Sequence, residues 1–344
     1  MIFTLCYFIL ALFILITVHE FGHFIIARLC GVKVLCFSFG FGKTLASWQS
    51  KRGTNYIWSA LPIGGYVKML DTREGEVAAQ ERHLAFNNKS TIKRIAIIIA
   101  GPLFNFIFAF AALYLALIIG VKSFLPIIES VRANSPAHLA GLRAGDVVKI
   151  INNTPIKNWY HLASFINHPP TKLLRLVVIR NGEKMTMHLD EGQGSRFTGL
   201  ELTKPLQFTI EKQQFLPAVK ISFIKTIELI KFNYIVYAYL FIGKIGVDNI
   251  SGPIGIAKFA SNAARAGISY YLSFLALLSI SLGTLNLLPI PLLDGGHLLY
   301  CLIEVIQRRP LSERLRIAGV YIGLFFVITL MLVAIKNDLS HLWH

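Results

Sequence analysis

The chain begins with an almost unbroken apolar run, residues 2 to 29, that contains His19, Glu20 and His23. No charged side chain occurs in residues 2 to 16, and apolar residues follow the three ionisable ones. A helix of about 20 apolar residues crosses the hydrocarbon core of a bilayer. Because ionisable groups are costly at that depth, their presence indicates a functional site. The run therefore predicts a membrane helix that carries chemistry.

The three ionisable residues form the pattern H-E-x-x-H, residues 19 to 23. Residues four apart share one face of a helix, so both imidazoles can bind one metal ion. Glu20 lies between them, where a carboxylate can act as general base towards the attacking water. The short pattern also arises by chance, and a single histidine on an apolar helix is usually structural. Two histidines and a glutamate inside one span favour a catalytic metal site.

The composition supports a membrane protein. Of 344 residues, 54% are hydrophobic and only 15% are charged, which is too apolar for an ordinary soluble chain and fits several spans with one soluble insert. The net charge of +16 comes without a nucleic-acid recognition motif, so we expect the lipid bilayer, and no nucleic acid, as the basic residues' partner. No Lys or Arg precedes the first run, so we expect no cleavable signal peptide. The cysteines are scattered and are expected to be free: Cys6, Cys30, Cys36 and Cys301.

The spans and the charges between them predict a topology. We expect transmembrane helices at residues 2–29, 95–120, 270–290 and 317–335, in two membrane halves, 1–121 and 269–344. Residues 30–94 are rich in Lys and Arg and are therefore placed in the cytoplasm, with both termini outside. A basic patch after the third span returns the chain to the cytoplasm: Arg308, Arg309, Arg314 and Arg316.

Residues 30–94 predict a small sheet. Short strands are expected at 34–39, 55–60 and 65–70, separated by Gly-rich turns. The stretch 61–70 is apolar for a cytosolic loop. It either dips back towards the membrane and lines a cavity, or belongs to a soluble hairpin sheet.

The long segment between the second and third spans has two parts. Residues 122–210 have a soluble composition and predict one small β-rich binding domain outside the membrane, with a hairpin at 174–189 that turns at Asn181-Gly182. Residues 211–268 form a surface segment, in which residues 215–244 predict an amphipathic helix along the membrane surface.

The start of the second span contains Gly101, Pro102 and Asn105. Glycine allows two helices to approach closely, and an amide inside a membrane needs a hydrogen-bond partner. These residues either serve packing alone or lie near the active site.

A zinc hydrolase needs a third protein ligand. Asp294 follows Pro289 and Pro291 at the cytoplasmic end of the third span, on the side of His19 and His23. It is the predicted third ligand, with His297 ranked below it and a helix N-cap as the alternative role for Asp294. Asn286 is an intramembrane amide that could clamp an extended substrate backbone. Since substrate must unwind to be cut, an exposed strand edge at 61–70 could hold it by β-addition.

Over nearly its whole length the chain resembles the site-2 intramembrane zinc metalloproteases, and within them the bacterial regulator of sigma-E protease type. The resemblance rests on these motifs: H-E-F-G-H (19–23), L-P-I-G-G-Y-V-K-M-L-D-T-R-E-G-E-V (61–77), F-N-N-K-S (86–90), A-G-P-L-F-N-F (100–106), N-I-S-G-P-I-G-I-A-K (249–258) and N-L-L-P-I-P-L-L-D-G-G-H (286–297). It implies that His19, His23 and Asp294 bind Zn2+ and that Glu20 is the catalytic base. It also implies that Asn286 and Pro291 accommodate substrate.

The resemblance further implies an α-helical polytopic membrane protein with four transmembrane helices, a cytoplasmic-side membrane-reentrant β-hairpin or sheet, and one inserted periplasmic PDZ-like α+β domain. The reentrant strand would bind substrate through Gly64, Gly65, Tyr66, Val67, Lys68 and Met69. The expected location is the bacterial inner membrane, with the active site towards the cytoplasm. The expected substrate is a single-span membrane protein of the anti-sigma factor type, first cut by a periplasmic protease, or a remnant signal peptide.

One departure and two rival interpretations accompany this resemblance. Proteins of this type usually carry two PDZ domains, whereas residues 122–210 have room for one, which looks more like the second of the pair. A catalytically idle scaffold protein acting through its PDZ domain would be expected to lack Glu20 or a ligand, and all are present. A transporter would show inverted repeats, and the two halves of the chain show no similarity.

Overall fold

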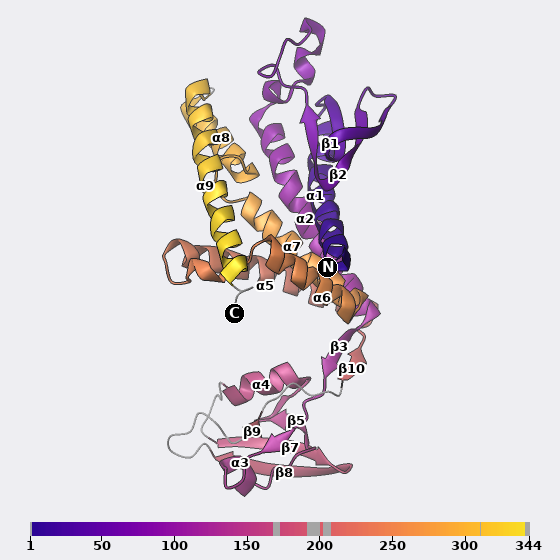
Figure 1. Ribbon diagram of the computed structural model, residues 1–344, viewed down its shortest axis with the longest axis vertical. Coiled ribbons are helices and arrows are strands. Elements are labelled where there is room, and N and C mark those ends of the chain that lie inside the picture. The colour runs from indigo at the N-terminus through magenta and orange to yellow at the C-terminus, as the bar shows by residue number, and fades with distance from the viewer. Residues whose placement is uncertain (1, 168–172, 191–199, 202–207, 310, 341–344) are drawn as a thin grey trace. The chain divides into compact units, whose positions relative to one another are not determined.

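The computed structural model describes residues 2–167, 173–190, 200–201, 208–309 and 311–340 (Figure 1). The chain divides into two compact units. One unit is helical and combines Met1–Ile119 with Gln214–His344, and the other is the insert Gly120–Gln213.

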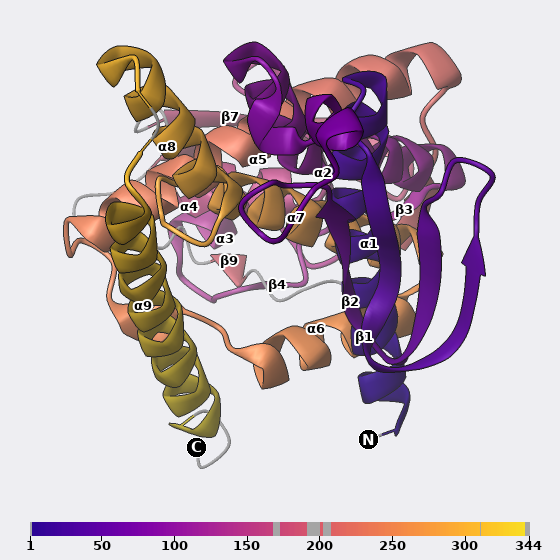
Figure 2. The ribbon, with the colours of Figure 1, turned by 90° about the horizontal axis from the view of Figure 1, so that it is seen from above.

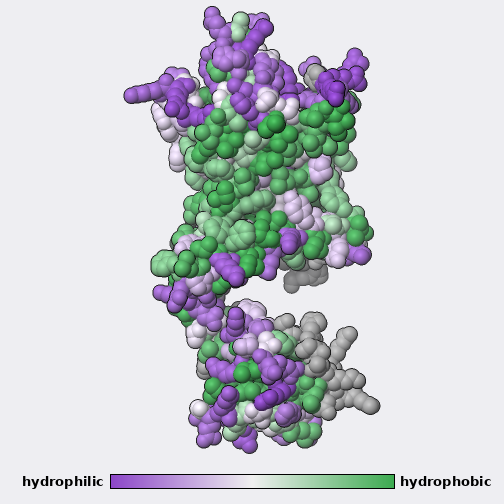
Figure 3. Space-filling view, turned by 180° about the vertical axis from the view of Figure 1, so that it is seen from behind, coloured by the Kyte–Doolittle hydropathy of each residue, from purple (hydrophilic) through white to green (hydrophobic). Residues whose placement is uncertain are grey.

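Four helices in the described residues are long and apolar enough to cross a membrane, which confirms the predicted number of spans: α1 (Ile2–Leu29), α2 (Thr91–Ile119), α7 (Ile268–Asn286) and α9 (Glu313–Ser340). The third ends at Asn286 instead of residue 290, because Pro289 and Pro291 disfavour helix at and before their positions. The second begins four residues earlier than expected, and the fourth extends beyond 317–335 at both ends. In Figure 3 a hydrophobic belt covers the middle of this unit.

Helix α2 is the centre of the helical unit. It packs against α1 and α7, and also against α5 (Phe215–Phe241) and α8 (Asp294–Gln307). Where α1 crosses α2, a Cβ on Gly22 would clash with the backbone carbonyl of Ala100, so the glycine sets the close approach. On the other side, small side chains of α2 interlock with α7 in a cluster of Ala109, Ala112, Leu113, Ala276 and Ile280.

Helix α9 stands apart from α1 and α2 and is fixed near its C-terminal end (Figures 1 and 2). The Asp338 carboxylate accepts backbone N–H groups of Gly252, Ile254 and Gly255 at the start of α6 (Pro253–Ala266). A carboxylate is favourable at a helix N-terminus, where the unpaired N–H groups point outwards. Asn337 donates to the carbonyls of Val247 and Ile250 around a short 3-10 helix, η3 (Val247–Asn249). Helix α6 packs in turn on α1 and α7.

The sheet of the helical unit contains two long antiparallel strands, β1 (Val34–Gln49) and β2 (Asn55–Met69), and packs on α1 (Figure 2). The prediction of three short strands is wrong, since 55–60 and 65–69 belong to one strand and β1 continues to Gln49. Gly40, Gly42 and Gly64 have positive φ and bend the strands without ending them. The bends give four adjacent segments in the order 65–69, 34–39, 55–58, 44–49, so that 65–69 lies at an edge. Two 3-10 helices, η1 (Ala79–Leu84) and η2 (Phe86–Asn88), lead to α2.

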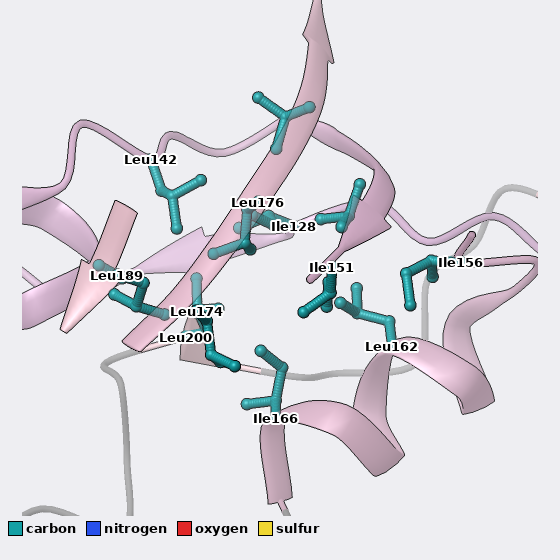
Figure 4. Packing of buried hydrophobic residues seen from close by; sticks show 13 residues of the cluster. Ile128, Leu142, Ile151, Ile156, Leu162, Ile166, Leu174, Leu176, Leu189 and Leu200 are labelled. Atoms are coloured by element: carbon teal, nitrogen blue, oxygen red, sulfur yellow. The ribbon is translucent and has the colours of Figure 1, made fainter. Parts of the chain in front are cut away.

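The insert is an α+β unit with a core of its own (Figure 4). Its main sheet has the order β6 (Thr154–Pro155), β5 (Val147–Ile151), β7 (Leu173–Arg180), β8 (Glu183–Asp190). The predicted hairpin is confirmed, and its turn residues Asn181 and Gly182 both have positive φ. Two short pairs complete the strands, β3 (Val121–Phe124) with β10 (Phe208–Glu211) and β4 (Ser130–Val131) with β9 (Leu200–Glu201). The helices are α3 (Pro136–Leu139) and α4 (Trp159–Asn167).

Candidate metal centre

His19, His23 and Asp294 meet inside the helical unit. The histidines lie one turn apart on α1, and Asp294 is the first residue of α8. The two Nε2 atoms are 3.2 Å apart, and Asp294 Oδ2 lies 3.2 Å from His19 Nε2 and 3.5 Å from His23 Nε2. No other group of three His, Cys, Asp or Glu side chains in the described ranges brings its ligand atoms so close together.

The triangle of ligand atoms has the size of a zinc site. With metal–ligand distances of about 2.0–2.1 Å, two ligand atoms of a tetrahedral site lie about 3.3 Å apart. Asp294 Oδ2 is buried and has no hydrogen-bond partner in the part of the chain that the structure describes. Two imidazole nitrogens and a carboxylate oxygen are the donor set of many zinc hydrolases, and three ligands leave a fourth position open. The residues therefore fit Zn2+.

Helix α2 orients both imidazoles. His23 Nδ1 donates to the backbone carbonyl of Ile97 at 2.8 Å, which leaves the Nε2 lone pair for a metal. His19 Nδ1 lies 3.1 Å from the side-chain amide of Asn105. The amide's Oδ1 atom has no other partner among the described residues, and with Oδ1 turned towards His19 it accepts the Nδ1 proton. Both Nε2 atoms then face Asp294 as unprotonated ligands.

The three α2 positions that contact the rings, residues 97, 101 and 105, are four apart and share one face. A Cβ on Gly101 would clash with His23 Nε2 and His19 Cε1, so only glycine leaves room for the rings. Gly101 and Asn105 therefore lie against the two histidine rings. Pro102 is buried inside α2 next to Gly101.

Glu20 lies beside the triangle and faces the sheet. Its Oε2 atom accepts the backbone N–H of Val67 at 3.1 Å. Two cavities, of about 430 and 420 Å³, meet here, and both are lined by Glu20, His23, Tyr66, Val67 and Asp294. The carboxylate thus lies between the ligand atoms and the edge segment of β2.

The strand predicted to bind substrate, residues 64–69, lies at the larger cavity. Its first two residues and its last four have different positions. Tyr66, Val67, Lys68 and Met69 line the larger cavity. Gly64 and Gly65 form the bend that precedes them, where a Cβ would clash with the Phe41 ring and the Ser38 carbonyl respectively.

The remaining predicted residues are distributed around the turn between α7 and α8. Asn286, the last residue of α7, lines the smaller cavity. Pro291 packs against Gly319 and Gly323 of α9 and is not among the residues that line either cavity. His297 lines the larger cavity but lies outside the triangle, and burial lowers its pKa. Asp294 does not cap α8, since Leu293 is the N-cap and no side-chain capping bond occurs.

Several groups at the site were not predicted. The Ile97 carbonyl and the Val67 N–H are backbone groups, and the residue type at a position does not indicate the contacts of its backbone. Arg73, Glu74 and Arg316 line the larger cavity. The signal for the first two was the charged sequence D-T-R-E (71–74) shortly after β2, and the basic patch was the signal for Arg316.

Comparison with known proteins agrees with this geometry. Residues 7–330 match the model of peptidase family M50. The chain is 34% identical to the regulator of sigma-E protease RseP of Escherichia coli (strain K12), and the alignment covers 97% of this chain and 98% of that protein. A putative zinc metalloprotease of Vibrio cholerae is 32% identical with the same coverage, and one of Xylella fastidiosa (strain Temecula1) is 32% identical over 95% of this chain and 96% of its own. The first alignment runs over 440 positions, more than the 344 residues here, so that relative contains segments that this chain lacks.

Proposed function

This chain belongs to peptidase family M50 and is a zinc metalloprotease, and on that premise we propose that it is an intramembrane endopeptidase that cuts single-span membrane proteins. The substrates are of the anti-sigma factor type, already shortened outside the membrane by another protease, or are remnant signal peptides. The proposal is supported chiefly by the position of Glu20, which lies between a zinc-sized ligand triangle and an exposed strand edge.

The residues of the site have distinct roles in the proposed reaction. His19, His23 and Asp294 would hold Zn2+, which when bound activates water and polarises the scissile carbonyl. Glu20 takes a proton from the attacking water and passes it to the leaving amine. Asn105, Gly101 and the Ile97 carbonyl keep the imidazoles in place.

Substrate would bind as an added strand on β2. Peptide bonds in a membrane helix are shielded by their own hydrogen bonds, so the helix must unwind before it is cut. Residues 65–69 form the edge of the sheet and end at the cavity wall, and an extended chain bound there would pass Glu20. Asn286, which lines the smaller cavity together with Tyr66 and Val67, would hold the same chain.

The proposed setting is the bacterial inner membrane. In this arrangement residues 30–94 face the cytoplasm, and both termini and the insert are periplasmic. The insert, residues 122–210, would act as a single PDZ-like domain, and α5 within 211–268 would lie along the membrane surface. The acidic and basic residues of the larger cavity, among them Asp71, Arg73 and Arg316, fit a site that opens to water on the cytoplasmic side.

The test is cleavage of a truncated single-span anchor by the purified full chain and by Glu20→Gln. Removing a general base is expected to lower the turnover rate by about 10²–10⁴-fold. Zinc content should stay equal in the two proteins, because Glu20 lies outside the ligand triangle. His19→Ala serves as the control that loses zinc and activity together.

Two results would contradict the proposal. If Glu20→Gln cuts as fast as wild type, the carboxylate is not the base. If wild type, loaded with zinc, cuts none of several such anchors, the chain acts as a selective binding or scaffold protein through its PDZ-like insert.

A further inference from the structure

Four arginines surround a cavity that takes no part in the metal centre. The cavity has a volume of about 300 Å³ and is lined by Arg73, Arg94, Arg308 and Arg309 together with Asn87, Thr91 and Glu304. We call it the arginine pocket. It lies where the loop after β2, the start of α2 and the end of α8 meet. Arg73 alone among these residues also lines the larger cavity of the metal centre.

The one carboxylate of the arginine pocket is already occupied. Glu304 Oε2 accepts Arg94 Nη1 at 2.7 Å, and its Oε1 atom accepts the backbone N–H of Leu311 at 3.2 Å. Although burial opposes it, these bonds lower the pKa of Glu304, so the group is ionised at neutral pH and pairs with Arg94. The two side chains are only 13% and 12% exposed. They form a fixed wall, in which each carboxylate oxygen already accepts one hydrogen bond.

The remaining arginines leave the pocket with excess positive charge. Arg73 is bound by both carboxylate oxygens of Asp71. Arg308 and Arg309 are exposed, and within the described residues no carboxylate lies at ion-pair distance from either. Arg94 Nε is buried and has no hydrogen-bond partner there. The guanidinium groups of Arg308 and Arg309 are thus available to an anion.

The donors suit a phosphate group. Guanidinium presents N–H pairs that match two oxygens of a phosphate, and four arginines without a lysine favour that geometry over a diffuse positive surface. Thr91 is the first residue of α2, where backbone N–H groups point out of the helix. A volume of about 300 Å³ is at the small end of the range for ligand sites and is sufficient for a headgroup.

Two exposed apolar side chains lie close in sequence to residues that line the arginine pocket. Ile92 directly follows Thr91 and is 80% exposed, and Ile306 comes two residues before Arg308 and is 81% exposed. In Figure 3 the hydrophobic belt of the helical unit gives way to hydrophilic residues at one end. A ligand in the pocket would therefore meet charge on one side and hydrocarbon-facing surface on the other, as an amphiphile requires.

We propose that the arginine pocket binds the phosphate group of an acidic phospholipid. Phosphate is the chemistry that the pocket recognises, and its two sources are a lipid headgroup and free inorganic phosphate. The exposed Ile92 and Ile306, close in sequence to the pocket residues, favour the lipid. The site would fix the start of α2 and the end of α8 to the surface of the bilayer.

The experiment is a titration of the detergent-solubilised full chain, followed by native mass spectrometry. The probes are phosphatidylglycerol, phosphatidylcholine of the same acyl chains, and inorganic phosphate. The test variant is R308Q/R309Q. The matched control is K51Q/R52Q, which removes the same charge from the turn between β1 and β2, outside the pocket. Unfolding temperatures check that both variants stay folded.

Each lysine or arginine near an anionic headgroup contributes about 1 kcal/mol, so two together give about 30-fold in affinity. Wild type should bind phosphatidylglycerol about 30-fold more tightly than phosphatidylcholine. R308Q/R309Q should lose about 30-fold of that affinity, and K51Q/R52Q less than about twofold. R308K/R309K keeps the charge but not the paired N–H groups, and should fall between wild type and R308Q/R309Q.

The other outcomes are also decisive. Phosphate binding that R308Q/R309Q removes, without a preference for phosphatidylglycerol, would keep the phosphate site and make free phosphate its source. Equal losses in R308Q/R309Q and K51Q/R52Q would overturn the proposal, because the charge of the whole surface would then explain binding. Binding of none of the three probes would overturn it as well.

Discussion

At the scale of single residues, the hydrogen bond that each imidazole makes through Nδ1 determines whether its Nε2 atom can bind a metal. His23 Nδ1 donates a hydrogen bond to a backbone carbonyl of α2, and His19 contacts the side-chain amide of Asn105. Asn105 is fully buried, and its backbone carbonyl accepts a hydrogen bond from the hydroxyl of Ser279 on α7. The orientation of His19 is thus set by two further helices.

We expect Asn105→Leu to weaken zinc binding by about 10–100-fold, the usual effect of removing a group that orients a metal-binding histidine. Leucine has a similar size but cannot accept the Nδ1 proton of His19. The measurement is the zinc dissociation constant by competition with a chelator. Ser279→Ala is the control, because it removes a hydrogen bond to the backbone of Asn105 and leaves the ring contact. Equal zinc affinity in wild type and Asn105→Leu would contradict this role.

The sequence predicted which side chains meet at this centre better than it predicted what holds them. His19, Glu20 and His23 follow from helical spacing alone, and Asp294 follows from the side of the membrane and the two prolines before it. The structure brings Asp294 Oδ2 within 3.2 Å of His19. The contacts made by the Ile97 carbonyl and the Val67 N–H depend on how helices and sheet pack, and every residue has the same backbone groups.

At the scale of elements, the bends in β1 and β2 explain why the sequence predicts three short strands where the structure has two long ones. A glycine among β-forming residues is usually read as the end of a strand. Here Gly40 and Gly64 take positive φ, and the chain changes direction while pairing continues on either side. The result is an edge segment, 65–69, whose Val67 N–H is donated to Glu20.

We expect Val67→Pro to lower the specificity constant kcat/KM for a membrane anchor by about tenfold. Proline removes the N–H that contacts Glu20, and a docked strand would lose one main-chain hydrogen bond, worth about 1–1.5 kcal/mol. Leu45→Pro on the opposite edge segment is the matched control and should keep near wild-type cleavage. The measurement is kcat/KM of both variants and of wild type, together with the unfolding temperature of each protein. A similar loss in both variants would show that sheet stability, not docking, is affected.

The ion pair of Arg94 and Glu304 joins α2 to α8 and predicts a pH dependence of stability. The pKa of Glu304 is lowered in the folded protein, so its contribution is present above its unfolded pKa, about 4.3, and is lost as the pH falls through the lower folded value. At pH 7 we expect Glu304→Gln to cost about 2 kcal/mol.

The measurement for this pair is the unfolding temperature of wild type and Glu304→Gln at pH 7, 5 and about 3.5. The difference between them should be largest at pH 7 and should shrink at the lowest pH. Glu76→Gln is the control, since Glu76 is exposed and has no ion pair among the described residues. A difference that stays constant with pH would contradict the role of the ionised pair.

At the scale of the whole molecule, the residues of the metal centre are far apart in the sequence but all belong to the helical unit. Residues 19–23, 97–105 and 294 all belong to the helical unit, whereas the insert has its own core of Ile128, Leu142, Val148, Leu176 and their neighbours. The insert begins and ends with a pair of strands, in which Val121 lies opposite Glu211. Its two ends are therefore adjacent, about 5 Å apart at Cα.

We expect the helical unit to keep its zinc site when residues 121–211 are replaced by a short Gly-Ser linker. A linker of four residues spans the gap between the paired ends without strain. Zinc content and the chelator-derived dissociation constant should stay within about twofold of the full chain, because no ligand or orienting group comes from the described residues of the insert. The same shortened protein with His23→Ala is the control that should lose zinc. If the shortened protein folds but has lost zinc, the insert contributes to the geometry of the metal centre and the two units are not independent.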